Sequence, residues 1–164
     1  MAEQPQPVTD AVAGLLRRGW SIAVAESLTG GLLTAELVGV PGVSAVLRGG
    51  VVAYDTAVKA SVIGVDQGLL DAHGAVHPRV AEQMADRIRA ALAVGGEPAR
   101  IGLATTGVAG PDPQDGQPPG TVFLGFAAGE RVWSRRLDLT GDRAAIRAAA
   151  VSESLTELLR MVRE

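Results

Sequence analysis

The sequence predicts an α/β fold, a three-layer α/β/α sandwich with a mixed sheet. Short apolar segments alternate with segments of helical periodicity over the first two thirds of the chain, which is typical of parallel strands joined by helices. Two apolar segments then follow each other across residues 128–131, which predicts an antiparallel hairpin. No linker-like stretch interrupts residues 8–164, so we expect a single domain there, preceded by a flexible tail at residues 1–7.

The first half of the chain supplies two strands and several short helices. A helix is expected up to residue 18, capped by Thr9 or Asp10 and ended by Gly19. The apolar segment 21–25 is expected to be a strand, followed by a helix over 32–40. A second strand is expected at 48–54. Short helices then follow around Lys59 and near 66–72.

The second half begins with an amphipathic helix over 79–94, because apolar residues recur there at helical spacing. A strand is expected at 100–105. Residues 106–120 contain four prolines and form a loop too long for a simple connection. The hairpin strands are expected at 121–127 and 132–139, and the last helix at 142–163.

Composition excludes several classes of site. The chain has no cysteine, so disulfides and Cys-ligated zinc are excluded. His73 and His77 are four residues apart, but Gly74 and Pro78 disfavour a regular helix between them, and we interpret both as loop residues rather than metal ligands. We therefore expect neither a metal nor a cofactor.

Charge and hydropathy bear on partners and location. The net charge is −3, which speaks against a nucleic-acid-binding protein. No run of eighteen apolar residues is present, and the polar start of the chain lacks the features of a signal peptide. We expect no membrane association and a cytoplasmic location.

The turn after the first strand is the first segment suited to chemistry. Residues 25–31, AESLTGG, bring the hydroxyl of Ser27 to a glycine-rich turn that opens a helix. The amides of Thr29, Gly30 and Gly31 are expected to be unpaired there and to bind a phosphate or an oxyanion. The alternative is that Ser27 or Thr29 simply caps the helix.

The chain contains a single lysine, Lys59, against fourteen arginines. Arginine cannot lose its proton in a protein, whereas a partly buried lysine can become neutral and act as a base. Lys59 follows Tyr54 at an expected strand end, where ligand sites gather in α/β sheets. A serine needs a base to become nucleophilic, and Lys59 is the best candidate. The alternative is a surface lysine beside a core tyrosine.

Two further segments offer ligand-binding groups. Thr105, Thr106 and Gly107 end the third expected strand and can approach a ligand, or they can form a turn that requires glycine. Arg143 and Arg147 lie one turn apart at a helix start and can hold a phosphate, or they can pair with Asp142 at the surface.

Together these segments resemble the C-terminal domain of the CinA family. The distinctive motifs are AESLTGG at 25–31, GGVVAYDTAVK at 49–59, TTGVAGPD at 105–112 and PPGTVF at 118–123. The resemblance implies nicotinamide mononucleotide (NMN) amidohydrolase activity, also called NMN deamidase, which releases ammonia and nicotinate mononucleotide without a metal. It implies that Ser27 is the nucleophile, that Lys59 activates it, and that Tyr54 assists.

The remaining site residues have expected roles in the same reaction. The amides of the Thr29–Gly31 turn would hold the oxyanion, Thr105–Gly107 would line the ligand, and Arg143 would meet the phosphate, with Arg147 a weaker candidate. The chain departs from the common family pattern at Leu28, where members often have Cys, and at His77, where members often have Ser.

Other functions stay open at this point. One is a nucleotide-binding module without catalysis, and another is an interaction protein linked to competence or DNA damage. A metal-dependent amidase is a lesser alternative. The apolar helices also allow a homo-oligomer, which we expect because many small α/β enzymes pair.

Overall fold

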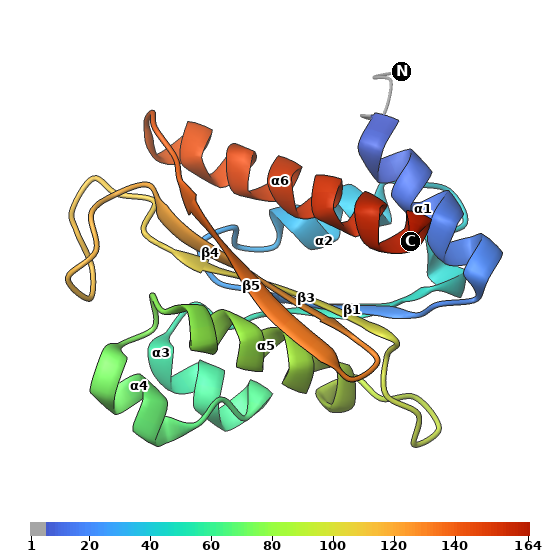
Figure 1. Cartoon of the computed structure of the whole chain (residues 1–164), viewed down its shortest axis with the longest axis horizontal. Coiled ribbons are helices and arrows are strands. Elements are labelled where there is room, and N and C mark those ends of the chain that lie inside the picture. Colours follow the sequence, from blue (N-terminus) through green and yellow to red (C-terminus); the bar gives the residue numbers. More distant parts are fainter. Residues whose placement is uncertain (1–5) are drawn as a thin grey trace.

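A five-stranded mixed sheet forms the middle layer of the computed structural model, which describes residues 6–164 (Figure 1). The strands are arranged in the order β2-β1-β3-β4-β5. The parallel part joins β1 (Ile22–Glu26) to β2 (Leu47–Val52) on one side and to β3 (Ile101–Gly107) on the other. β4 (Thr121–Ala128) and β5 (Arg131–Asp138) continue the sheet as an antiparallel hairpin.

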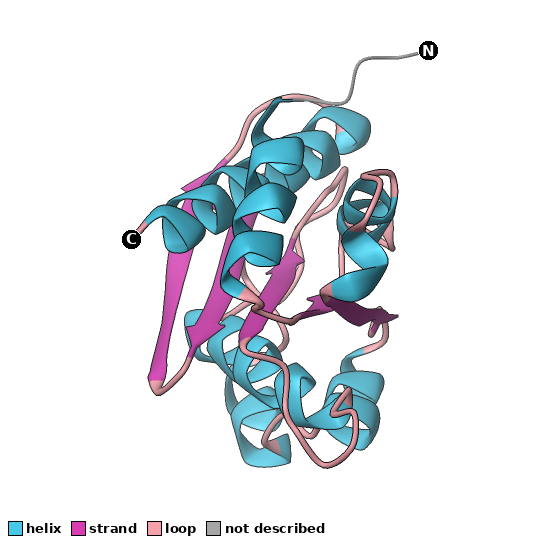
Figure 2. Ribbon diagram, turned by 90° about the vertical axis from the view of Figure 1, so that its right-hand side faces the viewer, coloured by secondary structure: helices cyan, strands magenta, loops and turns pink. Residues whose placement is uncertain are grey.

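Helices cover both faces of this sheet, as Figures 1 and 2 show. One face carries α1 (Gln6–Arg18), α2 (Leu32–Val38), the short 3₁₀ turn η1 (Val43–Ala45) and α6 (Arg143–Arg163). The other carries α3 (Thr56–Val58), the π-helical turn η2 (Lys59–Ile63), α4 (Gln67–His73) and α5 (Pro78–Ala91). The predicted three-layer sandwich with a mixed sheet is confirmed.

The two faces of the sheet differ in side-chain size. The face toward α1 and α6 carries large apolar residues such as Leu103 and Phe126, while the face toward α5 carries mainly alanine and glycine. At Gly102 and Gly125 an added Cβ would overlap backbone carbonyl oxygens of α5. Small residues at these positions therefore let α5 lie directly against the strands.

Several boundaries differ from the prediction: α2 ends at Val38, β3 continues to Gly107, and Thr9 and Asp10 lie inside α1 rather than capping it. Helix α1 begins at Gln6, so Gln6 and Pro7 belong to its first turn rather than to a tail, and residues 1–5 lie outside the described residues. Proline is well suited to a first helical turn because its missing N–H has no partner there in any case. Helix α5 ends at Ala91, and β2 ends at Val52, so Tyr54 follows the strand instead of closing it.

Within residues 6–164, no helix combines the length and the apolar character that a membrane crossing requires.

The close approach of α5 to the sheet predicts a cost for any side chain at Gly102. We expect Gly102→Ala to lower the free energy of unfolding by about 1–3 kcal/mol, because the new methyl group meets backbone that cannot rotate away. Gly68→Ala is the matched control, since Gly68 is exposed on α4 and its added Cβ meets only ordinary contacts. Urea unfolding of both variants measures the difference, and equal stability would contradict this account of the packing.

Candidate active site

Ser27 lies at the point where β1 turns into α2. Its backbone N–H donates to the carbonyl oxygen of Thr105 at 3.0 Å, which ties it to the end of the neighbouring strand β3. Gly30 and Gly31 have φ values of 59° and 101°, a left-handed conformation that suits glycine and makes the tight turn possible. The side chain of Ser27 is largely buried, with 8% of the residue exposed.

Lys59 lies in η2, on the face of the sheet opposite to α2, and its side chain contacts Ser27. Its Nζ lies 3.0 Å from Ser27 Oγ, 2.7 Å from the carbonyl oxygen of Ala53 and 3.3 Å from that of Tyr54. Only 1% of Lys59 is exposed. This burial lowers the pKa of the Lys59 ammonium from 10.5 to about 8, although the negative charges of Asp55 and Asp115 act in the opposite direction.

The three oxygen atoms around Lys59 match both protonation states of an amine. A protonated lysine has three N–H donors, one for each oxygen. A neutral lysine has two donors for the carbonyls of Ala53 and Tyr54, and its lone pair then faces the hydroxyl of Ser27. The carbonyl oxygens cannot donate, so the serine hydroxyl is the only neighbour of the three that can give a proton to that lone pair.

A polar cavity of about 310 Å³ opens beside Ser27. Its walls come from the turn that carries Ser27, from Tyr54, from the loop after β3 and from the start of α6. The lining residues are Ser27, Leu28, Tyr54, Gly107–Gln114 and Arg143. Arg143 spans this cavity, because one guanidinium nitrogen donates to Gly110 O at 2.7 Å and another to Tyr54 Oη at 3.0 Å. The side chain of Tyr54 therefore contacts Arg143, and only its backbone carbonyl contacts Lys59.

The turn amides are arranged differently from the prediction. The N–H of Gly30 donates to Ser27 O at 3.0 Å and that of Gly31 to Glu26 Oε1 at 3.2 Å, so neither is free for an oxyanion. Within the described chain, the amides of Leu28 and Thr29 have no hydrogen-bond partner. Leu28 lines the cavity while Thr29 is fully buried, so the Leu28 amide is the one that a ligand in the cavity can reach.

Glu26 explains why the glycine amides are occupied. This carboxylate is fully buried and accepts from the amides of Gly31, Leu33 and Thr34 and from the Thr34 hydroxyl, at 2.7–3.2 Å. It thereby accepts from backbone N–H groups at the start of α2 that have no partner within the helix. Negative charge is favourable at the N-terminus of a helix. Glu26 is a structural acceptor that holds the turn carrying Ser27.

Three predicted ligand-lining threonines have internal partners instead. Thr29 Oγ1 and Thr105 Oγ1 lie 2.8 Å apart, and Thr106 Oγ1 donates to Ala75 O at 2.8 Å. All three residues are buried, and none lines the cavity. Of the predicted segment Thr105–Gly107, only Gly107 reaches the cavity wall.

Arg143 and Arg147 do not form a pair around one ligand. Arg147 donates through Nε to Leu28 O at 2.8 Å and through Nη2 to Thr29 O at 3.3 Å, so it braces the turn that carries Ser27. Arg143 lines the cavity and Arg147 does not. Of the two arginines offered as phosphate ligands, the structure brings only Arg143, the stronger candidate, to the cavity.

His73 and His77 lie at helix ends away from the cavity. His73 is the last residue of α4 and not a loop residue, and His77 caps α5 by accepting from Arg79 N through Nδ1. Capping is a role that serine also performs well, which explains how either residue suits this position. The described part of the chain contains no group of three or more potential metal-binding side chains.

The model of the CinA C-terminal domain matches residues 6–162 of the chain. The chain belongs to this family. A CinA-like protein of Frankia casuarinae is 51% identical over 152 residues, which make up 92% of this chain and 34% of that protein. The chain thus spans about a third of that relative.

Solved structures of the CinA superfamily have the same fold. A superfamily protein from Klebsiella pneumoniae superposes with a TM-score of 0.89 at 31% identity, with 99% of each chain covered. The competence/damage inducible protein CihA of Agrobacterium tumefaciens gives a TM-score of 0.84 at 29% identity over all of both chains. The domain is therefore found as a whole chain in both of these structures.

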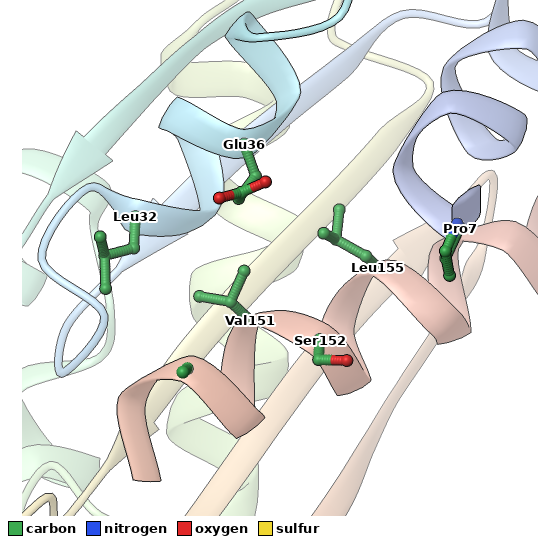
Figure 3. Close-up of a pocket in the computed structure, with 7 residues that line it drawn as sticks. Pro7, Leu32, Glu36, Val151, Ser152 and Leu155 are labelled. Carbon is green, nitrogen blue, oxygen red and sulfur yellow. The ribbon is translucent and has the colours of Figure 1, made fainter. Parts of the chain in front are cut away.

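This CinA domain has a second, apolar cavity of about 260 Å³ between α2 and α6 (Figure 3). The side chains that Figure 3 labels at this cavity are Pro7, Leu32, Glu36, Val151, Ser152 and Leu155. Glu36 is the one titratable side chain among the lining residues, and no amine stands beside Ser152 as Lys59 stands beside Ser27. The polar cavity at Ser27 is the candidate active site.

Two features of the site were not found from the sequence. Residues 108–114 were expected to belong to a long loop after a strand end that can approach a ligand, but not to form most of one wall of the cavity. The free amides of Leu28 and Thr29 depend on which amides Glu26 captures, and no sequence signal shows that choice.

The bonds to Glu26 predict a stability cost for its amide variant. Glu26→Gln places an NH₂ group, which cannot accept, opposite some of the N–H and O–H donors of α2. We expect the free energy of unfolding to fall by about 1–3 kcal/mol, the usual cost of buried groups without partners. Glu36→Gln is the matched control, because Glu36 lies within α2 itself and is only half-buried. Thermal unfolding compares the two, and a similar melting temperature for both would contradict a structural role for Glu26.

Proposed function

We propose that this domain hydrolyses the carboxamide of NMN, giving nicotinate mononucleotide and ammonia. The observation that carries the proposal is the 3.0 Å contact between Ser27 Oγ and Lys59 Nζ at the edge of a polar cavity. A hydroxyl next to a buried amine of lowered pKa is suited to nucleophilic attack. Membership in the CinA family, together with the motifs that resemble NMN amidohydrolases, directs the choice of substrate.

In the first step Ser27 Oγ attacks the carboxamide carbon while neutral Lys59 takes the hydroxyl proton. The carbonyls of Ala53 and Tyr54 orient the amine during this transfer, because they accept its two N–H bonds. The positive charge of the pyridinium ring makes the carboxamide carbon more electrophilic and so reduces the demand on the base.

The tetrahedral intermediate needs donors for its oxyanion. The free amide of Leu28 at the cavity wall is the candidate, and the amide after the nucleophile commonly serves in this role in other serine hydrolases. Collapse of the intermediate breaks the C–N bond, and Lys59 returns the proton to the departing ammonia. Because the Tyr54 hydroxyl contacts Arg143 and not Lys59, Lys59 gives this proton directly, and Tyr54 assists through its backbone carbonyl.

The second step releases the acid. Lys59, neutral again, takes a proton from a water molecule that attacks the nicotinoyl ester on Ser27. The ester C–O bond breaks, Ser27 recovers its proton, and nicotinate mononucleotide leaves. Arg143 supplies a fixed guanidinium in the same cavity, which supports a role in binding the phosphate of the nucleotide.

Removal of either reacting group is expected to abolish ammonia release. Ser27→Ala removes the nucleophile, and Lys59→Arg keeps a positive charge but cannot accept the serine proton. Each variant should lose at least about a hundredfold in kcat/KM with NMN. Ser61→Ala, an exposed serine in the same helical turn as Lys59, is the control that should keep wild-type activity.

Three outcomes of this assay would speak against the proposal. Undiminished turnover in Lys59→Arg would remove the Ser–Lys mechanism. A thermal shift with NMN but no ammonia from the wild-type protein would favour a nucleotide-binding module. Loss of activity after chelation would favour a metal-dependent amidase.

The pKa of Lys59 predicts the direction of the pH dependence. The base must be neutral, so kcat/KM should rise with pH through about 8 and level off above it. An unshifted lysine would place this rise near 10.5 instead. Initial rates of ammonia release between pH 6 and about 10 measure the profile. A rate that falls through pH 8 would contradict Lys59 as the base.

A further inference from the structure

The loop between β3 and β4 forms the outer wall of the cavity and is held at its base and on one side. At the base, Val108 N donates to Thr121 O at 2.9 Å and Gly120 N donates to Val108 O at 2.8 Å. On the cavity side, Arg143 donates to Gly110 O. The lining residues beyond Gly110, which extend to Gln114, are exposed and lie farther out.

Asp115 holds the tip of this loop. Its Oδ2 accepts from Ala75 N at 2.8 Å and from Val76 N at 3.3 Å, in the turn that joins α4 to α5. Gln114 and Gln117 close the tip by two mutual backbone bonds of 3.1 and 2.8 Å. Within the described chain, no other side chain between Pro111 and Pro119 bonds to residues outside the loop.

The turn at Gly74 is shaped to receive this carboxylate. Gly74 has a φ of 73°, and a Cβ at this position would overlap the carboxyl group of Asp115. Two successive amides that point at one oxygen form a backbone site for an anion, and Asp115 of the same chain occupies it. The missing side chain and the two donors are separate features that favour the same contact.

The same turn is also tied to the end of β3. Ala75 donates its N–H to Asp115 and accepts from the hydroxyl of Thr106 through its carbonyl oxygen, at 2.8 Å in each case. Thr106 immediately precedes the cavity wall, and Asp115 immediately follows it. Both ends of the wall are thus attached to Ala75, which closes a ring of contacts around residues 107–114.

We propose that Asp115 is a positioning residue that latches the outer wall of the cavity in its substrate-binding position. This assignment rests on the proposed function for its effect on catalysis, but the latch itself does not. Without Asp115 the tip of the loop loses its side-chain hydrogen bonds to the rest of the protein. The wall then has to be brought into position each time substrate binds. An apparent affinity falls in proportion to the fraction of molecules with the wall in place.

Asp115 has a second effect that must be separated from the first. It is one of two carboxylates whose charge raises the pKa of Lys59; the other is Asp55, which caps α3. Loss of either charge should therefore move the rising limb of the pH profile to lower pH. Only loss of the Asp115 bonds should release the wall.

Three variants of the whole chain distinguish these effects. Asp115→Ala removes both the bonds and the charge, and Asp115→Asn keeps an oxygen that can accept but removes the charge. Asp55→Asn removes a charge alone, because asparagine also caps helices well. Asp115→Ala is expected to raise KM for NMN about tenfold with kcat changed less than about twofold at the pH plateau. Asp115→Asn should lie nearer the wild type in KM, and Asp55→Asn should match it.

Hydrogen exchange provides a readout that needs no activity. In Asp115→Ala, the hydrogen-bonded amides of Ala75, Val76, Gln114 and Gln117 should exchange at least about tenfold faster, with α6 unchanged. Wild-type exchange at these amides, or a wild-type KM in the active variant, would overturn the latch. A wild-type protein that releases no ammonia would overturn the proposed function, and the exchange result would still decide on Asp115.

Discussion

The site depends on the burial of one amine among three oxygen atoms. Water would stabilise the ammonium form of Lys59, and the protein replaces it with Ser27 Oγ and the carbonyls of Ala53 and Tyr54. These three oxygens stabilise the positive charge less well than water does, so the pKa of Lys59 falls to about 8. Every N–H of the amine still has a partner. The amine is therefore held in place in either protonation state, and its lone pair has one neighbour that can give it a proton.

Several elements are needed to hold that arrangement. Glu26 organises the start of α2 from within, and Arg147 of α6 binds the carbonyls of Leu28 and Thr29 from the other side. The turn that carries Ser27 is thus fixed by a buried carboxylate and a guanidinium that do not themselves line the cavity. Such supports limit the freedom of Ser27, and the role proposed for it requires a geometry kept within fractions of an ångström.

The sequence was a good guide to which segments lie close together. It was a poorer guide to the hydrogen-bond partners of their polar groups. Ser27 and Lys59 were expected together because both follow strands that end at one edge of the sheet, and the structure brings them together. The glycine amides and the threonine hydroxyls were expected to face a ligand. They have internal partners instead, such as Glu26 for Gly31 and Ala75 for Thr106, because buried polar groups in a folded protein are almost always hydrogen-bonded.

Local patterns in the sequence were enough to predict the layers, the mixed sheet and the place of Ser27 and Lys59 near strand ends. These features follow from apolar residues, glycines and caps that act over a few residues. The folded chain was needed to show that Arg147 braces a turn while Arg143 enters the cavity, and that Asp115 reaches the turn after Gly74. These choices depend on distances between segments far apart in the chain, where a shift of a few ångströms exchanges one hydrogen-bond partner for another.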